Sequence, residues 1–108
     1  MKEILAVIRP DKAADTKKAL SDNGFPGFTG RSVNGRGREA VSYEMPDHSV
    51  HQFYLLPKRA FILEVEDDDI QEVVELIMDV NSTGNQGDGK IFVLPVHSSY
   101  VVSSGEKE

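Results

Sequence analysis

The stretch FILEVEDDDIQEVVELIMDVN, which spans residues 61–81, reads as one β-strand followed by one α-helix. Phe61, Leu63 and Val65 occupy alternate positions at its start, which is the period-2 pattern of a strand with two different faces. Between strand and helix stand the acidic residues 67–69, which suit a helix N-terminus, by capping and through the helix dipole, better than a metal site. Apolar residues then recur at helical spacing, and these are Ile70, Val73, Val74, Ile77 and Val80.

The same order of elements continues on both sides of this stretch. Toward the C-terminus, a glycine-rich segment leads into residues 90–96, which predict another strand. Toward the N-terminus, residues 3–8 predict a strand, and a helix opens at Pro10-Asp11 and ends at Gly24, where a positive φ suits a helix C-cap. A further strand is expected at about residues 28–33. Strand, helix and strand thus occur twice, which predicts an α+β fold of the ferredoxin-like split βαβ type, with a four-stranded antiparallel sheet and two helices on one face.

The composition excludes several classes of protein. The 108 residues include 12 Lys and Arg against 18 Asp and Glu, which gives a formal charge of −6, and they include no cysteine. This length predicts a single domain over residues 1–108. Without cysteine there is no disulfide, cysteine-ligated zinc site or thiol nucleophile, and the acidic balance argues against nucleic acid as a partner. No apolar run approaches the roughly 20 residues that span a bilayer, and Met1-Lys2-Glu3 leads directly into a strand, so membrane insertion is not expected and the expected location is the cytoplasm.

A long segment, about residues 36–56, joins the two halves and shows no clear periodicity. Such segments are uncommon inside compact domains and usually serve a function. We therefore expect a long exposed loop that contacts a protein partner, and the alternative is an insertion without a binding role. His48 and His51 have an H-x-x-H spacing, but no third ligand can be named, so no metal site is predicted. The polar stretch of about residues 97–108 is expected to form a C-terminal tail.

Two glycine-rich segments carry the features of an anion site. Gly84-Asn85-Gln86-Gly87-Asp88-Gly89-Lys90 matches a P-loop by letter, but Ile91 follows where Ser or Thr would bind magnesium, and the segment leads from helix to strand. Its backbone amides and lysine could still surround an anion, although the alternative is an ordinary connection with glycine caps. Gly35-Arg36-Gly37-Arg38 offers guanidinium groups suited to phosphate, and the two segments could meet across a subunit boundary. Lys58-Arg59 either belongs to such a site or is a pair of solvated charges at a strand start.

These segments, taken in order, resemble the PII signal-transduction proteins over nearly the whole chain. The motifs are Thr83-Gly84-x-x-Gly87-Asp88-Gly89-Lys90-Ile91-Phe92-Val93, the opening Met1-Lys2-x-Ile4-x-Ala6-x-Ile8-Arg9-Pro10-x-Lys12, Gly35-Arg36-Gly37-Arg38 and Leu56-Pro57-Lys58. The resemblance implies a homotrimer of ferredoxin-like subunits. It also implies that a T-loop, at residues 36–56, reaches a regulated partner, and that ATP and ADP compete for sites between subunits.

The resemblance further implies which residues contact ligands. Lys58 corresponds to the family lysine that pairs with 2-oxoglutarate, and Thr29 would approach the adenine. Glu39 stands where the family has a glutamine that coordinates the Mg²⁺ bridging ATP and 2-oxoglutarate. No catalytic or metal-ligating residue is expected, and the cofactor-binding set is Thr29, Gly35, Gly37, Arg38, Glu39, Lys58, Gly87, Asp88, Gly89 and Lys90.

Several positions depart from the family pattern. The carboxylate of Glu39 would repel the doubly charged 2-oxoglutarate, and Val101 and Ser103 stand where the family has two phosphate-binding arginines. His51 replaces the tyrosine that many bacterial members uridylylate, so this modification is not expected. The alternative to a sensor of ATP and 2-oxoglutarate is therefore a divergent PII-like trimer that senses ADP, AMP or another small anion.

The short chain and the segments 80–84 and 55–59 are most similar to the PII subgroup encoded with nitrogenase genes. This similarity implies a nitrogen-status regulator whose T-loop contacts nitrogenase, an ammonium transporter or glutamine synthetase. The enzyme alternative is a small phosphatase with Arg9 as the anion holder. It lacks an identifiable residue to position water, so no enzymatic activity is expected.

Overall fold

The computed structural model describes residues 1–35, 41–44, 46–53 and 55–108, and in 41–44 and 50–53 it describes the backbone. A short 3-10 turn precedes each helix, Pro10–Lys12 before α1 and Asp67–Asp69 before α2. The helices and strands are β1 (Lys2–Ile8), α1 (Ala13–Asp22), β2 (Thr29–Gly35), β3 (Val41–Glu44), β4 (Val50–Phe53), β5 (Leu56–Val65), α2 (Ile70–Asn81) and β6 (Gly89–Pro95).

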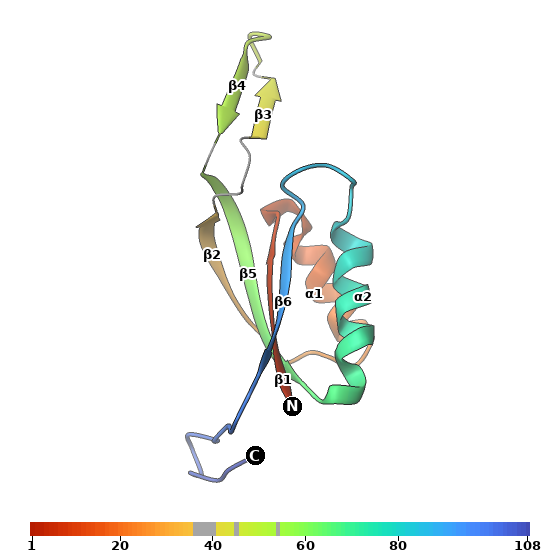
Figure 1. The fold of residues 1–108 in the computed structure, drawn as a ribbon, viewed down its shortest axis with the longest axis vertical. Coiled ribbons are helices and arrows are strands. Elements are labelled where there is room, and N and C mark those ends of the chain that lie inside the picture. The colour runs from red at the N-terminus through yellow and green to blue at the C-terminus, as the bar shows by residue number, and fades with distance from the viewer. Residues whose placement is uncertain (36–40, 45, 54) are drawn as a thin grey trace.

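The main sheet has four strands in the order β2-β5-β1-β6, and all neighbouring strands are antiparallel. Both helices cover the same face of this sheet (Figure 1). The predicted ferredoxin-like arrangement is therefore confirmed. β2 and β6 lie at opposite edges of this sheet.

The core lies between the sheet and the helices. β1 and β5 direct alternate side chains toward the helices, because strand side chains alternate between the two faces of a sheet. Phe61 is fully buried and packs edge-to-face on Phe28, with 5.3 Å between the ring centroids. The buried core residues are Ile4, Ala6, Ile8, Ala13, Leu20, Phe61, Leu63, Val65, Val73 and Ile77.

The predicted end of α1 is confirmed at Gly24, which has φ +89°. The amide of Gly24 donates to the carbonyl of Ser21 at 3.2 Å, and the amide of Phe25 donates to that of Leu20 at 2.8 Å. This pair of hydrogen bonds is the Schellman motif, whose left-handed residue is usually glycine.

The start of α2 differs from the prediction. No side chain of residues 67–69 caps the 3-10 turn or the helix, so the expected capping is wrong. Instead, the carboxylate of Asp67 accepts a hydrogen bond from the α-amino group of Met1 at 3.0 Å. This contact lowers the pKa of Asp67 and fastens the N-terminus to the turn before α2.

β5 and the long segment also correct the sequence prediction. The strand expected from Phe61 begins at Leu56, so the aperiodic segment is shorter than 36–56. Pro57 is tolerated there because β1 pairs with β5 only as far as Arg59, which leaves Pro57 with a neighbour on the β2 side alone. Within the segment, β3 and β4 form a two-stranded antiparallel sheet that projects away from the body (Figure 1).

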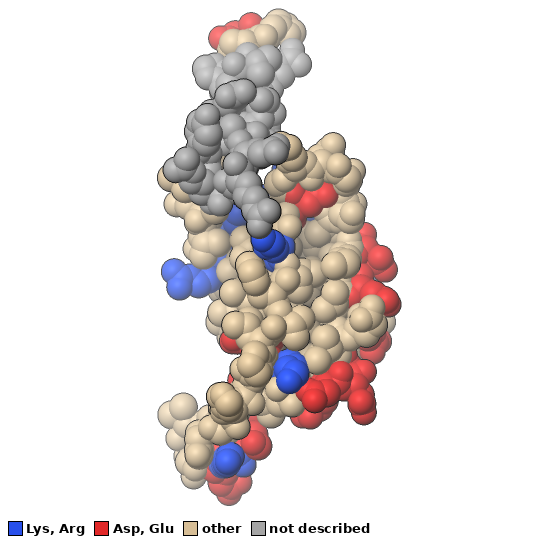
Figure 2. Space-filling model, in the orientation of Figure 1, with Lys and Arg blue, Asp and Glu red and all other residues tan. Residues whose placement is uncertain are grey.

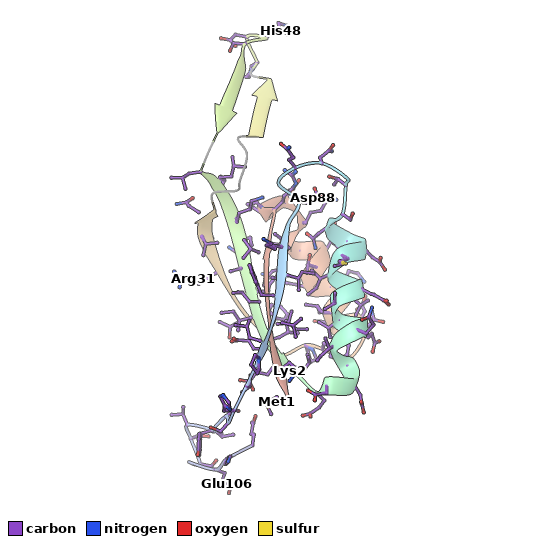
Figure 3. The ribbon with its side chains drawn as sticks, viewed as in Figure 1. Met1, Lys2, Arg31, His48, Asp88 and Glu106 are labelled. Atoms are coloured by element: carbon purple, nitrogen blue, oxygen red, sulfur yellow. The ribbon has the colours of Figure 1, made fainter. Side chains whose placement is uncertain are left out.

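The C-terminal tail extends in the opposite direction. After β6 ends at Pro95, a single β-bridge between Tyr100 and Lys107 closes residues 99–108 into a small turn. The amide of Glu108 donates to the carbonyl of Ser99 at 2.9 Å, and that of Val101 donates to Glu106 at 2.8 Å. His48 at the hairpin tip and Glu106 in the tail therefore mark opposite ends of the molecule (Figure 3), whose longest extent is 56 Å.

The two faces of the domain have different surface chemistry. Acidic side chains gather along the helix layer (Figure 2), where residues 66–79 contain carboxylates and no lysine or arginine. The centre of the helix-free face of the sheet is apolar, because Leu5 pairs with both Ile62 and Phe92 and strand alternation places these side chains on one face. Phe92 is 44% exposed and Leu94 is 38% exposed.

Candidate functional site

Three parts of the chain converge at one end of the main sheet. β2 ends there at Gly35, which pairs with Leu56 at the start of β5. β6 begins there at Gly89, which pairs with Ile8 at the end of β1. The connection from α2 to β6, residues 82–88, arches over this end of the sheet (Figure 1). We call residues 83–89 the glycine loop.

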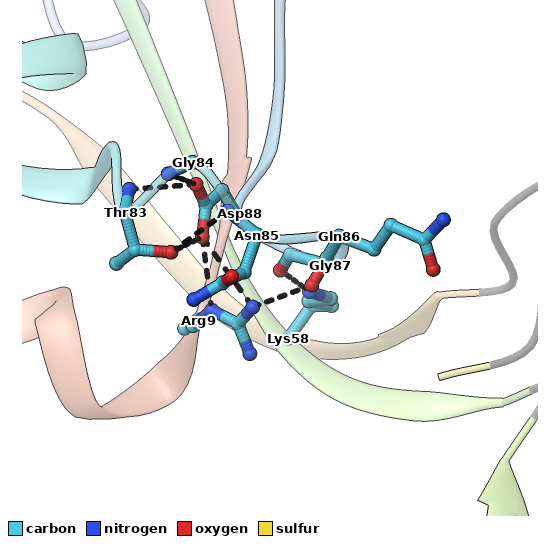
Figure 4. A network of polar contacts seen from close by, with 8 residues as sticks. All are labelled: Arg9, Lys58, Thr83, Gly84, Asn85, Gln86, Gly87 and Asp88. Atoms are coloured by element: carbon cyan, nitrogen blue, oxygen red, sulfur yellow. Dashed lines mark hydrogen bonds and ion pairs between the residues drawn. The ribbon is translucent and has the colours of Figure 1, made fainter. Parts of the chain in front are cut away.

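Asp88 is the centre of the polar network in the glycine loop (Figure 4). One carboxylate oxygen, Oδ2, accepts from the amides of Thr83 at 2.7 Å and Gly84 at 3.1 Å. The other, Oδ1, accepts from the Thr83 hydroxyl at 2.5 Å and from the Arg9 guanidinium at 3.3 and 3.4 Å. The carboxylate thus joins the start of the loop to its end, and Arg9 joins both to the end of β1.

These donors change the acidity of Asp88. Hydrogen bonds from Thr83 and the charge of Arg9 favour the carboxylate form and lower the pKa of Asp88 to about 2. The group therefore stays ionised well below the pH at which an ordinary aspartate takes up a proton.

This pKa shift predicts a loss of stability in acid. A carboxyl group whose folded pKa is depressed stabilises the fold above its unfolded pKa and loses this effect as pH falls through its folded pKa. We expect Asp88 to contribute about 1–2 kcal/mol near neutral pH, and this contribution should fall away between about pH 5 and pH 2. The measurement is the free energy of unfolding in urea over this range. Asp88→Asn should remove this part of the pH dependence and Asp79→Asn should keep it; identical profiles for Asp88→Asn and wild type would contradict the assignment.

Two cations hold the carbonyl groups of the glycine loop. The Arg9 guanidinium also donates to the carbonyl of Gln86 at 2.6 Å, and the Lys58 ammonium donates to the carbonyl of Gly87. Lys58 is only 8% exposed, and its burial, with the nearby charge of Arg9, lowers the pKa of Lys58. Among the described residues, a lysine and an arginine face a single carboxylate, Asp88, which gives this part of the site a net positive charge.

The backbone of the loop has donors left over. Hydrogen bonds within the loop use the amides of Thr83, Gly84 and Asn85. Among the described residues, the amide of Gly87 has no acceptor, and the amide of Asp88 takes part only in the turn of residues 85–88. Successive amides in a glycine-rich turn form a concavity that binds anions, and Lys90 follows directly. The loop is therefore able to bind an anion such as a phosphate.

The structure brings some of the predicted site residues together. Gly35 lies against the Lys58 side chain, since a Cβ atom on Gly35 would stand 3.2 Å from Lys58 Cγ. Lys58 in turn contacts Gly87, and Asp88 and Gly89 continue the loop into β6. One chain thus joins the end of β2 to the glycine loop through Lys58.

Other predicted residues lie apart from this group or outside the described residues. Thr29 is at the opposite end of β2, six residues or about 20 Å from Gly35 along the strand. Lys90 lies on the helix-free face, with its ammonium 5.7 Å from the centroid of the Phe92 ring. Val101 and Ser103 belong to the tail. Gly37, Arg38 and Glu39 lie outside the described residues.

Sequence reasoning missed the supporting parts of the network. Thr83 entered the prediction only as a letter of the family signature, and Arg9 as a letter of the opening motif and as the anion holder of a phosphatase. The contacts show that both act on Asp88 instead. A threonine two residues after the end of a predicted helix was the available signal for Thr83, because such hydroxyls commonly bond the adjacent backbone or turn.

A groove of about 370 Å³ lies beside β2 and shares Lys58 with the site. It includes Lys58 and Arg59, and the Arg59 guanidinium donates to the Ser32 hydroxyl at 2.8 Å on its wall. None of its lining residues belongs to the glycine loop. Residues 83–86 and Gly89 of the glycine loop are exposed within the described chain.

No group of three or more His, Asp or Glu side chains that could hold a metal ion is present in the described ranges. None of the helices in the described part of the chain has the length and apolar character needed to cross a membrane.

Comparison with known proteins places the chain in one family. Residues 1–106 match the family model "Nitrogen regulatory protein P-II". The chain is 40% identical to "Nitrogen fixation nifHD region GlnB-like protein 2" of Methanothermobacter marburgensis, over 99% of this chain and 96% of the relative. It is 40% identical to the "GlnB-like protein 1" of the same region in Methanothermococcus thermolithotrophicus, over 98% and 97%. It is 41% identical to "Nitrogen regulatory protein P-II 2" of Methanothermobacter thermautotrophicus, over 98% and 92%. The chain therefore belongs to the nitrogen regulatory protein P-II family.

Proposed function

We propose that this chain is a P-II-type regulator that binds ATP or ADP between the subunits of a homotrimer and controls a protein of nitrogen metabolism through residues 36–56. The observation that carries the proposal is the glycine loop, in which the amides of Gly87 and Asp88 donate to no side chain among the described residues and Lys90 follows in sequence. Backbone amides and a cation around a polyphosphate form charge-assisted hydrogen bonds, which are stronger than neutral ones. Family membership supports the adenine nucleotide as the source of that phosphate.

The homotrimer is supported by the helix-free face of the sheet. A sheet buries each apolar face against another layer, yet no element among the described residues covers Phe92 and Leu94, which are 44% and 38% exposed. Because β2 and β6 lie at opposite edges, the β2 edge of one chain can meet the glycine loop of the next. The open loop of one chain then becomes one wall of a cleft between chains.

The partner-binding role is supported by the shape of the chain. The β3–β4 hairpin projects from the body at the same end as the glycine loop (Figure 1). A ligand at the loop is therefore close to the base of the hairpin and can favour one arrangement of it, provided that the ligand binds the alternative arrangements unequally. The names of the relatives, from nifHD regions, make nitrogenase the first candidate partner. An ammonium transporter and glutamine synthetase are the others.

A second candidate function has specific support. Val101 and Ser103 carry no charge, and the resemblance places phosphate-binding arginines at these two positions. Each lost charge-assisted hydrogen bond weakens binding by about 1.5–3 kcal/mol. A trimer that senses ADP, AMP or another small anion, without binding 2-oxoglutarate, is therefore the alternative; Glu39, which would repel 2-oxoglutarate, favours it.

One substitution tests the part played by the tail. Ser103→Arg restores a guanidinium at a phosphate-binding position, and we expect it to tighten ATP binding by roughly tenfold to 100-fold. Ser104→Arg adds the same charge at the neighbouring position and should change the affinity far less. Isothermal titration calorimetry gives both affinities. Unchanged or weaker binding of ATP to Ser103→Arg would contradict the placement of the tail at the nucleotide.

The same method separates the two candidate functions. ATP, ADP and AMP are titrated into the wild-type chain, each with and without Mg²⁺ and 2-oxoglutarate. Binding of 2-oxoglutarate that requires ATP supports the ATP sensor. Binding of ADP or AMP in preference to ATP, with no response to 2-oxoglutarate, supports the divergent sensor.

A further inference from the structure

We infer that Asp88 is a positioning residue of the anion site: clamped by Arg9 and Thr83, its carboxylate holds the glycine loop in the shape that presents the amides of Gly87 and Asp88 to phosphate. This inference rests on the proposed function, since it concerns how the same loop recognises its ligand. It assigns Asp88 a role through the backbone and not by contact with the nucleotide or a metal ion.

The Asp88 carboxylate has no free acceptor position for a ligand or a metal ion. A carboxylate offers about four lone-pair positions. Oδ2 accepts two amide hydrogens, from Thr83 and Gly84, and Oδ1 accepts from the Thr83 hydroxyl and from Arg9. With both oxygens filled by donors of the protein, Asp88 is a poor ligand for Mg²⁺.

The contacts of Asp88, Arg9 and Lys58 also fix the path of the chain through the glycine loop. The bonds from Asp88 to Thr83 and Gly84 close a ring of backbone between the end of α2 and the start of β6 (Figure 4). Arg9 fixes this ring at two points, the Asp88 carboxylate and the Gln86 carbonyl. Lys58 fixes it at a third, the Gly87 carbonyl. The carbonyls of Gln86 and Gly87 point toward Arg9 and Lys58. Because the C=O and N–H of a trans peptide point in opposite directions, the amides that follow them point away from these cations.

The charge of Asp88 and its hold on the loop have opposite effects on phosphate binding. A carboxylate that faced a bound phosphate would repel it, so charge alone predicts tighter binding when Asp88 is neutralised. The clamp predicts the opposite, because the loop loses the shape that the phosphate needs. The sign of the change in affinity therefore distinguishes positioning from direct electrostatics.

The experiment compares four variants by calorimetry, with ATP, AMP and inorganic tripolyphosphate as probes. Asp88→Asn and Thr83→Val each remove clamp contacts, and only the first changes the charge. We expect both to weaken ATP and tripolyphosphate binding by about tenfold to 100-fold, which is the usual range for residues that orient the ligand-contacting groups by hydrogen bonds. AMP, with one phosphate, should lose less. Thr83→Ser keeps the hydroxyl and should remain within about twofold of wild type, and Asp79→Asn is the matched control for loss of an exposed carboxylate.

A second measurement keeps the test independent of folding and of the nucleotide. Amide hydrogen exchange without ligand should show protected amides at Thr83 and Gly84 in wild type and fast exchange in Asp88→Asn, with unchanged protection in β1 and β5. Tighter ATP binding by Asp88→Asn, or unchanged affinity together with unchanged exchange, would overturn the inference. If wild type itself binds neither ATP, AMP nor tripolyphosphate, the proposed function fails and the role of the clamp in it fails too. Failure confined to the variants leaves the proposed function standing.

Discussion

Replacing Gly89 with alanine is expected to separate β6 from β1 at the glycine loop and to abolish nucleotide binding. An added Cβ would lie 2.0 Å from the carbonyl oxygen of Val7 and 3.0 Å from its carbon, and both are backbone atoms that a side-chain movement cannot relieve. The residue also has φ +119°, a conformation that L side chains rarely adopt. Overpacking and backbone strain together should cost about 3–5 kcal/mol of unfolding free energy.

Gly84→Ala is the matched control for this prediction. Gly84 lies in the same loop with φ +80°, but no atom lies within 4 Å of the place of its Cβ. It should therefore lose only about 1 kcal/mol, from backbone strain alone. Urea unfolding gives both stabilities, and calorimetry gives the affinity for ATP. If Gly89→Ala is as stable as Gly84→Ala, the backbones of β1 and β6 move apart at little cost at this point, and the prediction is wrong.

A charge on the helix-free face is expected to dissociate the proposed trimer. Phe92 is 44% exposed in one chain and pairs with Leu5 on the apolar face of the sheet. If this face packs between subunits, Phe92→Glu buries an unpaired carboxylate in each chain. An uncompensated buried charge costs about 3–5 kcal/mol, and in a symmetric assembly every subunit bears that cost.

Sedimentation velocity at micromolar concentration measures the outcome. Wild type should sediment as a trimer and Phe92→Glu as a monomer. Met78→Glu is the matched control, because Met78 is 52% exposed on α2, in the helix layer, and should leave the trimer intact. A monomeric wild type, or a Phe92→Glu chain that sediments like wild type, would exclude this face as the interface.

The main sheet and both helices could be predicted from the sequence because their patterns are produced by burial. In β5 the alternation of apolar residues from Phe61 matches the alternation of buried side chains, and β1 is a short continuous apolar run that lies in the middle of the sheet. The stripe on α2 follows from the same cause, since Val73 and Ile77 face the core. The positive φ of Gly24 was also predictable, because the helix C-cap favours glycine there.

The start of β5 and the β3–β4 hairpin could not be predicted, because burial does not produce their pattern. Lys58 is buried, and its ammonium donates to the carbonyl of Gly87, 29 residues further along the chain. Because lysine is mostly exposed in proteins, the sequence suggests an exposed loop residue at this position. β3 and β4 are four residues each and pair only with one another, outside the core. A two-stranded sheet without a buried face leaves little periodicity to detect.

The candidate site shows the same limit. The glycines and Lys90 could be recognised as a candidate anion motif, because the flexibility of glycine and the charge of lysine are properties of the residue types themselves. The roles of Arg9 and Thr83 depend on contacts with Asp88 between segments distant in sequence or across a turn. Such contacts appear only once the sheet has placed the end of β1 beside the start of β6.

The most direct test of the central claim is a calorimetric titration of ATP into the wild-type chain, followed by displacement with ADP. The account predicts saturable binding at one nucleotide per chain, competed by ADP and by inorganic tripolyphosphate, because all three ligands offer phosphates to the glycine loop. Absence of saturable binding for ATP, ADP and AMP would contradict it. So would nucleotide binding that tripolyphosphate leaves unchanged, since recognition would then not depend on the phosphates.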